Sequence, residues 1–344
     1  MSPLAGTAVL VRWVVRRDRV RIGLWVLGVA AVVLAVASSV KGLYPDGVGL
    51  EKAASAISAN AAQVVLNGPD RALETLGGRT AFEVWNFGLV GVSLMSLLLV
   101  GRHTRGDEEA GRTELLRAAP VGRQAPIAAA LVVAAGANLA VGGLVTCGLA
   151  VVDLPLAGAV ALGGAFAAAG LFFAALAVFA AQVSANARVV SGVTGAALAA
   201  AFVVRGIGDA GDGSASWLSP LGWAQASRPF AGERWWPLLA LVAAAVALAG
   251  GAAVLAARRD LGAGMLGARP GRPTASRALS GPFGLALRLQ RGSLVGWGLG
   301  LFAGGLALGS VGGDVEDLLG DSDTARDVFA QGGGDVTLAF LATF

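Results

Sequence analysis

Apolar residues in this chain occur in long, nearly uninterrupted runs that short polar segments separate. The runs cover about residues 22–40, 84–101, 124–152, 154–181, 189–204, 235–257 and 294–313, and an eighth begins near residue 336. A helix needs roughly 20 apolar residues to cross a hydrocarbon core that is ~30 Å thick. The pattern therefore predicts an all-α, polytopic membrane protein.

The composition supports this interpretation and excludes several kinds of site. Of the 344 residues, 56% are hydrophobic and 14% are charged, whereas soluble domains carry about 25% charged residues. The single cysteine, Cys147, excludes an intrachain disulfide, and the single histidine, His103, argues against a histidine-based metal or catalytic site. We therefore predict no catalytic and no metal-binding residues in this chain.

Basic and acidic residues fall on alternate polar segments. With the N-terminus placed in the cytoplasm, 18 of the 26 Lys and Arg residues lie inside and 16 of the 22 Asp and Glu residues lie outside. Such an excess of positive charge is typical of cytoplasmic loops. Because arginine greatly outnumbers lysine, we infer a GC-rich bacterial genome. The charge pattern predicts a bacterial cell-membrane protein with a cytoplasmic N-terminus and no nucleic-acid partner.

The start of the sequence recurs near its end. A shift of 272 positions superimposes three pairs, each at the beginning of an apolar run: Arg16 on Arg288, Arg19 on Arg291 and Trp25 on Trp297. An even number of runs separates the two copies, so both enter the membrane from the same side, as in the parallel repeats of transporters. The second copy stops at Phe344. We expect the chain to be a fragment of a longer two-half protein, with a truncated gene product as the alternative.

The most charged segment lies between the second and third runs. Residues 102–123 read RHTRGDEEAGRTELLRAAPVGR. The acidic residues 107–109 suit the positive end of a short helix, and Leu115 with Leu116 give that helix an apolar side. Such an amphipathic helix can dock a cytoplasmic partner. A solvated loop that merely obeys the positive-inside rule is the alternative.

The string DEEAGRTELLRAAPVGR at 107–123 closely resembles the cytoplasmic loop after the second span of type 2 ABC transporter permeases. Together with WLSPLGW at 217–223 and RRDLGAG at 258–264, it makes the chain similar to the exporters of polyketide antibiotics, the tetronasin-resistance type, of actinobacteria. Members of that family usually join two six-span halves in one polypeptide, which agrees with the repeat. This sequence departs from the family by stopping about two spans into the second half.

The resemblance implies specific roles. Residues 102–123 would be the coupling loop that sits in a cleft of an ATPase subunit, and the residues implied to transmit the ATPase stroke are Glu108, Glu109, Gly111, Arg112 and Glu114. The stretch from about Val9 to Arg21 would be a connecting helix along the inner face. Its anchoring arginines, with those of the counterpart at 281–291, are Arg12, Arg16, Arg19, Arg288 and Arg291. The outside segment 205–234 would dip back into the membrane as short helices.

We therefore expect four segments: a connecting helix at 1–21, a first six-span half at 22–257, a cytoplasmic linker at 258–280 and an incomplete second half at 281–344. Ionisable residues are rare at membrane depth, and Arg205 is expected to flank the fifth span. A proton-coupled exporter would place Asp, Glu or His inside its spans. Their rarity favours energy delivered from outside the lipid.

ATP chemistry is not expected in this chain. A phosphate-binding loop of the form GxxxxGK[ST] needs a lysine, and the only lysines, Lys41 and Lys52, lie outside such a pattern. The expected function is the permease subunit of an ABC exporter for hydrophobic, antibiotic-like small molecules. A separate ATPase, expected as a homodimer, would hold ATP and Mg, so we expect no cofactor here. A membrane scaffold, a truncated remnant and a secondary drug transporter are the alternatives, and no pattern identifies a substrate-binding site.

Overall fold

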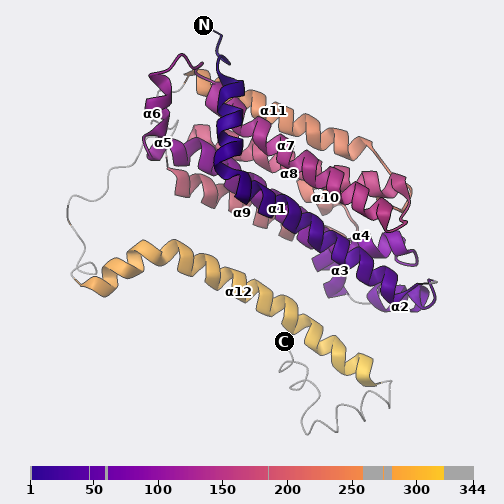
Figure 1. The fold of residues 1–344 in the computed structure, drawn as a ribbon. Helices are drawn as coiled ribbons and strands as arrows, with labels where there is room; N and C mark the ends of the chain where they lie inside the picture. Colours follow the sequence, from indigo (N-terminus) through magenta and orange to yellow (C-terminus); the bar gives the residue numbers. More distant parts are fainter. Residues whose placement is uncertain are drawn as a thin grey trace. The chain divides into compact units, whose positions relative to one another are not determined.

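A computed structural model describes residues 2–45, 47–58, 61–184, 186–258, 274 and 281–320 of the chain. Among these residues the regular structure is helical throughout (Figure 1). The chain divides into two compact units, Met1–Ala268 and Arg269–Phe344, and each is described by itself. The predicted linker at 258–280 and the run that begins near residue 336 lie almost entirely outside the described residues.

Long apolar helices build the first unit. Six of its described helices are long and apolar enough to cross a membrane: α1 (Thr7–Leu43), α4 (Leu76–Gly101), α7 (Ala125–Val151), α8 (Leu156–Val183), α9 (Ala187–Ala210) and α11 (Trp236–Arg258). They follow the first six apolar runs of the sequence. The predicted all-α, polytopic membrane fold is confirmed, whereas the division into permease halves stays a prediction.

Helix α8 is the centre of the first unit, where it packs against α4, α7, α9 and α11. Small residues allow this close packing, because a Cβ atom on Gly163 of α8 would collide with the backbone carbonyl of Gly142 in α7. In lipid, where burial of apolar surface does not drive helices together, such close approach of backbones is a main source of association energy. Glycines at this contact therefore allow the backbones of α7 and α8 to approach closely.

Phe230 closes one end of the bundle. It lies between α10 (Pro220–Gln225) and α11 with φ 61°, and its ring occupies the space that a Cβ atom would need on Gly77 of α4 or Gly158 of α8. The backbone N–H of Phe230 donates to Glu233 Oε1 at 3.3 Å. A single ring thus joins α4, α8 and the segment before α11.

Helix α1 bends near its first charged residues. Asp18 has non-helical angles, φ −109° and ψ 17°, so residues 7–17 and 19–43 form two helical parts (Figure 1). Leu10 and Val14 face inward on the first part, whereas the predicted anchoring residues Arg12, Arg16 and Arg19 are exposed. The first part ends before the expected Arg21, so that Arg19 lies beyond the bend, but its arginines are exposed as expected of a connecting helix. Its anchoring role stays a prediction.

We call the end of the first unit that carries residues 7–21, 102–123 and 184–188 the basic end. The opposite end carries α2 (Leu50–Ser58), α3 (Ala61–Asn67), the 3-10 helix η2 (Ala215–Leu218) and α10. The short helices expected within 205–234 are therefore present, and Leu221 and Ala224 of α10 are buried. Whether they dip into the membrane stays a prediction. Trp217 stacks on Trp236 with ring centroids 5.2 Å apart.

Helix α9 is longer than its apolar run. The run ends near residue 204, but the helix continues to Ala210, so Arg205 lies inside it and is 1% exposed rather than flanking the span. Arg205 Nη2 donates to the backbone oxygens of Val65 at 2.8 Å and Leu66 at 2.9 Å. These bonds, with that of Arg205 Nη1 to Asp209 Oδ2 at 3.3 Å, pair both terminal nitrogens of the buried guanidinium, which explains why the charge does not end the helix.

The second unit contributes one described helix, α12 (Pro282–Gly320), which has 39 residues. It contains the seventh apolar run and the second copy of the repeat, and its length is close to the 37 residues of α1. Arg288 and Arg291, the predicted counterparts of Arg16 and Arg19, lie in its exposed first part.

Candidate functional site

The second span does not end at the membrane-side border of the charged segment. Helix α4 passes directly into a π-helix, η1 (Arg102–Gly106), and then into α5 (Asp107–Glu109), so that residues 76–109 form one helical rod of 34 residues. Wide helical turns of this kind occur frequently at functional sites. The first third of the predicted coupling loop is therefore a stiff extension of the span.

Gly111 ends the rod and reverses the chain. Its φ of 70° lies in the left-handed region, which glycine adopts without a steric penalty. The short helix α6 (Arg112–Arg117) follows. The chain then returns along the N-terminal segment, where Gly122 N donates to Ala5 O at 2.9 Å and Gln124 N donates to Pro3 O at 3.0 Å. Residues 3–5 and 122–124, which are far apart in the sequence, thus meet at the basic end.

Asp18, the residue at the bend of α1, is a buried acceptor. Its Oδ2 lies 2.9 Å from Arg102 Nε and 2.7 Å from His103 Nε2. The side chains of Asp18 and His103 are 4% and 1% exposed. A buried charge is tolerated only when it is paired and hydrogen-bonded. The bend in α1 and the beginning of η1 are therefore held together by charge.

Asp107 is the second buried carboxylate of the site. Its Oδ1 accepts from Arg112 Nη1 at 2.7 Å and from Arg17 Nη1 at 3.0 Å. His103 Nδ1 lies 3.5 Å from Asp107 Oδ2, so the one imidazole of the chain stands between two carboxylates. We call the resulting network the elbow network; its members are Arg17, Asp18, Arg102, His103, Asp107 and Arg112. It joins the first part and the bend of α1 to η1, α5 and α6.

Glu108 and Glu109 link α5 to the other side of the bundle. Arg105 Nη1 donates to Glu108 Oε2 at 2.7 Å, and Arg105 Nε donates to the backbone oxygen of Ala181 near the end of α8. Glu109 Oε1 accepts from the backbone N–H of Ala187 at 2.7 Å, where the N-terminus of α9 favours a negative charge. Both glutamates therefore have structural partners within the protein.

The remaining predicted coupling residues point elsewhere. Glu114 and Leu115 lie on the exposed side of α6, where Leu115 is 77% exposed. Leu116 instead packs with the buried cluster of Leu10 and Ala125, so the two leucines do not share one apolar side as the sequence suggested. The structure thus separates the five predicted coupling residues into internal ties and an outward surface; their coupling role stays a prediction.

Sequence reasoning missed the elbow network. It contains five residues that were not predicted as site residues: Arg17, Asp18, Arg102, His103 and Asp107. Arg105, which lies beside the network, was missed as well. Two signals in the sequence mark them, because Asp18 is the only acid in an arginine-rich stretch and His103 precedes Asp107 by four residues, one helical turn. The partners that join α1 to this segment are 84 or more positions apart. No local pattern could have joined them.

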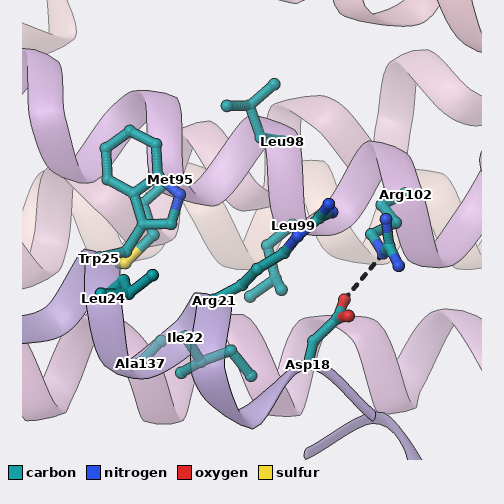
Figure 2. A pocket seen from close by; sticks show the side chains of 10 residues that line it. All are labelled: Asp18, Arg21, Ile22, Leu24, Trp25, Met95, Leu98, Leu99, Arg102 and Ala137. Carbon is teal, nitrogen blue, oxygen red and sulfur yellow. Dashed lines mark ion pairs between the residues drawn. The ribbon is translucent and has the colours of Figure 1, made fainter.

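A cavity of about 350 Å³ lies beside the elbow network (Figure 2). Residues of α1, α4 and η1, together with one residue of α7, line it: Asp18, Arg21, Ile22, Leu24, Trp25, Met95, Leu98, Leu99, Arg102 and Ala137. Figure 2 shows the ion pair of Asp18 and Arg102 on one side of the cavity, with Trp25 and Met95 together on the other. Within the described residues, no group of three or more His, Cys, Asp or Glu side chains is arranged to hold a metal ion.

Two comparisons with known proteins found similar sequences. The family described as the C-terminal domain of multidrug efflux system permease Rv1217c matches residues 279–344. The multidrug efflux system permease protein Rv1217c of Mycobacterium tuberculosis is 46% identical over 346 residues, which covers 99% of this chain and 62% of that protein. The chain thus spans less than two thirds of its relative. Over that span, both of its units are similar to a multidrug efflux permease.

Proposed function

We propose that this chain is the membrane-embedded permease part of an efflux system that exports hydrophobic small molecules and is driven by a separate ABC ATPase. The observation that carries the proposal is the 46% identity to a multidrug efflux permease over nearly the whole chain. The finer assignment, to the tetronasin-resistance type of polyketide exporter, rests on the motifs at 107–123, 217–223 and 258–264. In this proposal the basic end faces the cytoplasm.

The geometry of the basic end supports a mechanical role for the charged segment. The exposed face of α6, with Glu114 and Leu115, would receive the ATPase subunit. Because α5, η1 and α4 form one rod, a displacement of α5 moves the second span directly. The pairs Arg17–Asp107 and Asp18–His103 carry the same displacement to the bend of α1. Two spans would therefore respond to one docking event.

The middle of the bundle favours this proposal over a proton-coupled transporter. Beyond the arginine-rich first part and bend of α1, the charged residues of the six described spans lie near helix ends. The centre of α7 carries a neutral pair, in which Asn138 Nδ2 donates to Ser96 Oγ at 2.8 Å. A proton relay needs titratable groups at membrane depth. The proposed energy source is ATP, held with Mg on the partner ATPase, which would act as a dimer.

The test combines the natural full-length chain with its partner ATPase in lipid nanodiscs. Replacing Glu114 with Lys and Leu115 with Ala should abolish stimulation of ATP hydrolysis, because like charges at an interface can cost several kcal/mol. Both side chains are exposed, so the thermal unfolding temperature should not change. Val9→Ala, which alters a 69% exposed residue of α1 at the same end, is the matched control and should stimulate normally.

Two outcomes would contradict the proposal. The first is a permease that never co-purifies with an ATPase and transports no dye when ATP is supplied on the cytoplasmic side of the membrane. The second is a Glu114→Lys, Leu115→Ala variant that stimulates hydrolysis as well as the parent. This result would contradict docking of the ATPase on α6, whereas the efflux function would still be decided by the dye assay.

Reversal of Glu108 and Glu109 to Lys is a less specific test than the α6 variant. It should also abolish stimulation, but it removes the carboxylate partner of Arg105 and the acceptor of the Ala187 N–H. Burial of Arg105 without its partner is costly. The double reversal is therefore expected to lower the unfolding temperature as well, and only the α6 variant separates docking from folding.

A further inference from the structure

The cavity beside the elbow network continues as a groove along α1 and α4. A second cavity of about 410 Å³ shares Leu24 and Trp25 with the first, and its other lining residues are Gly28, Val29, Val32, Val33, Phe87 and Gly88. From Leu24 to Val33 the helix rises by about 14 Å. The two cavities together form one apolar groove with a charged entrance.

The groove opens sideways rather than into the bundle. Three of its lining side chains are apolar and exposed: Leu24 is 68% exposed, Phe87 63% and Leu98 51%. Exposed apolar residues on helices of membrane-spanning length face lipid. An acyl chain could therefore enter the groove from the membrane without any rearrangement of the helices.

The entrance of the groove carries positive charge. Arg102 is paired with Asp18, but it is still about a third exposed. Arg21 lines the same cavity, and among the described residues no ion pair joins it to a carboxylate. With both arginines and only one acid in its lining, the cavity attracts an anion.

The depth of the two arginines selects the kind of anion. Arg21 immediately precedes the apolar run 22–40, and Arg102 immediately follows the run 84–101. Both therefore lie where hydrocarbon meets water, at the level of lipid headgroups. Basic pockets between membrane helices at this level bind anionic headgroups. A soluble anion would match the charge but would leave the apolar groove empty.

We propose that the cavity between α1, α4 and α7 binds an anionic phospholipid, with its phosphate between Arg21 and Arg102 and one acyl chain along the groove to Val33. The bound phosphate shares Arg102 with Asp18, so the lipid touches the pair that holds the bend of α1. Lipid composition would thereby act on the elbow network. The proposal does not depend on efflux, because it concerns binding alone.

Trp25 lines both cavities, so its fluorescence can report whether a lipid occupies the groove. The full-length chain is placed in nanodiscs of phosphatidylcholine that contain a minor fraction of lipid with brominated acyl chains, either phosphatidylglycerol or phosphatidylcholine. Bromine quenches tryptophan fluorescence at contact. The difference in signal between the parent and Trp25→Phe isolates Trp25 from the other tryptophans. We expect stronger quenching by phosphatidylglycerol than by phosphatidylcholine at equal fractions.

Arg21→Gln tests the headgroup contact, and Arg19→Gln is its matched control. Arg19 is an exposed arginine two residues away that lies outside the lining of the cavity. Arg21→Gln should weaken the preference for phosphatidylglycerol about fivefold, the effect of one basic residue near anionic lipid. Arg19→Gln should retain most of the preference. Unchanged unfolding temperatures of both variants exclude misfolding.

Each other outcome overturns the proposal. Equal quenching by the two lipids shows that the site is an ordinary lipid-facing groove. Equal losses in Arg21→Gln and Arg19→Gln show diffuse attraction to a charged leaflet. Absence of quenching by either lipid shows that protein covers Trp25. Loss of the phosphatidylglycerol signal on addition of inorganic phosphate shows that a free anion, rather than a lipid, occupies the entrance.

Discussion

Both ends of the first unit bury an arginine almost completely, but the contacts around that arginine differ between the two ends. The side chains of Arg105 at the basic end and Arg205 at the opposite end are each 1% exposed. At the basic end, Arg105 pairs with Glu108 one turn away and donates to the backbone oxygen of Ala181. Around it, other charged side chains of different helices pair across long stretches of sequence. At the opposite end, Arg205 pairs with Asp209 one turn away, at 3.3 Å, and otherwise donates to backbone carbonyl oxygens.

The difference concerns what each end can do. Carbonyl oxygens are fixed to the backbone, and the contacts of the opposite end repeat this pattern, since Gln225 Nε2 donates to Asn67 O at 3.1 Å and Arg71 Nη1 donates to Gln225 O at 3.1 Å. At the basic end, Asp107 has two arginine partners and Asp18 has an arginine and a histidine. Shared side-chain partners allow discrete re-pairing, which switching elements use.

The largest effect is expected at the opposite end. Replacing Arg205 with Met removes the ion-pair partner of Asp209, which keeps only the hydrogen bond of Ser216 Oγ, and removes the donor to two carbonyl oxygens. We therefore expect a loss of about 3–5 kcal/mol of stability. Thermal unfolding in detergent measures it. The double variant Arg205→Met, Asp209→Asn should recover part of the loss, because it leaves no unpaired charge. A single variant as stable as the parent would show that these contacts do not fix the end.

The middle effect concerns the elbow network. Asp18→Asn keeps the shape and one acceptor but removes the charge facing Arg102 and His103, and we expect a loss of about 1.5–3 kcal/mol. In a double-mutant cycle with His103→Gln, the two losses should be non-additive by about 0.5–3 kcal/mol. Additive losses would contradict the shared network. If the comparison of the two ends holds, Asp18→Asn should also lower ATPase stimulation, whereas conservative changes at Arg205 should not.

The smallest effect is expected for the exposed pair Lys41–Asp153 at the opposite end, whose Nζ–Oδ2 distance is 2.8 Å. The hydrogen bond and charge of Lys41 lower the pKa of Asp153 below its ordinary value. Stability from the pair is therefore present at neutral pH and is lost only as the pH falls through this lowered pKa. Because solvent screens the pair, unfolding temperatures of the parent and Asp153→Asn should coincide at neutral pH; a clear gap would contradict this assignment.

The spans could be predicted from the sequence because hydropathy depends on composition and not on partners. The same holds for the arginine-rich stretch of α1 and for helical structure within 102–123, although the one expected short helix is divided at Gly111 into α5 and α6. The end of α9 could not be predicted, because the buried Arg205 donates hydrogen bonds to the carbonyl oxygens of residues 65 and 66, about 140 positions away. Asp18 and His103 were missed for a similar reason. A charged residue marks a helix end only when no distant acceptor satisfies it.

Phe230 has a consequence for the history of such chains. Its ring fills the space above Gly77 and Gly158, so neither glycine can acquire a side chain while the ring is present. Loss of the ring alone would leave a void next to two helices, which is costly. Each first step is therefore unfavourable, and the three positions are inherited as one unit. Relatives should differ there either at none of the three sites or at several together.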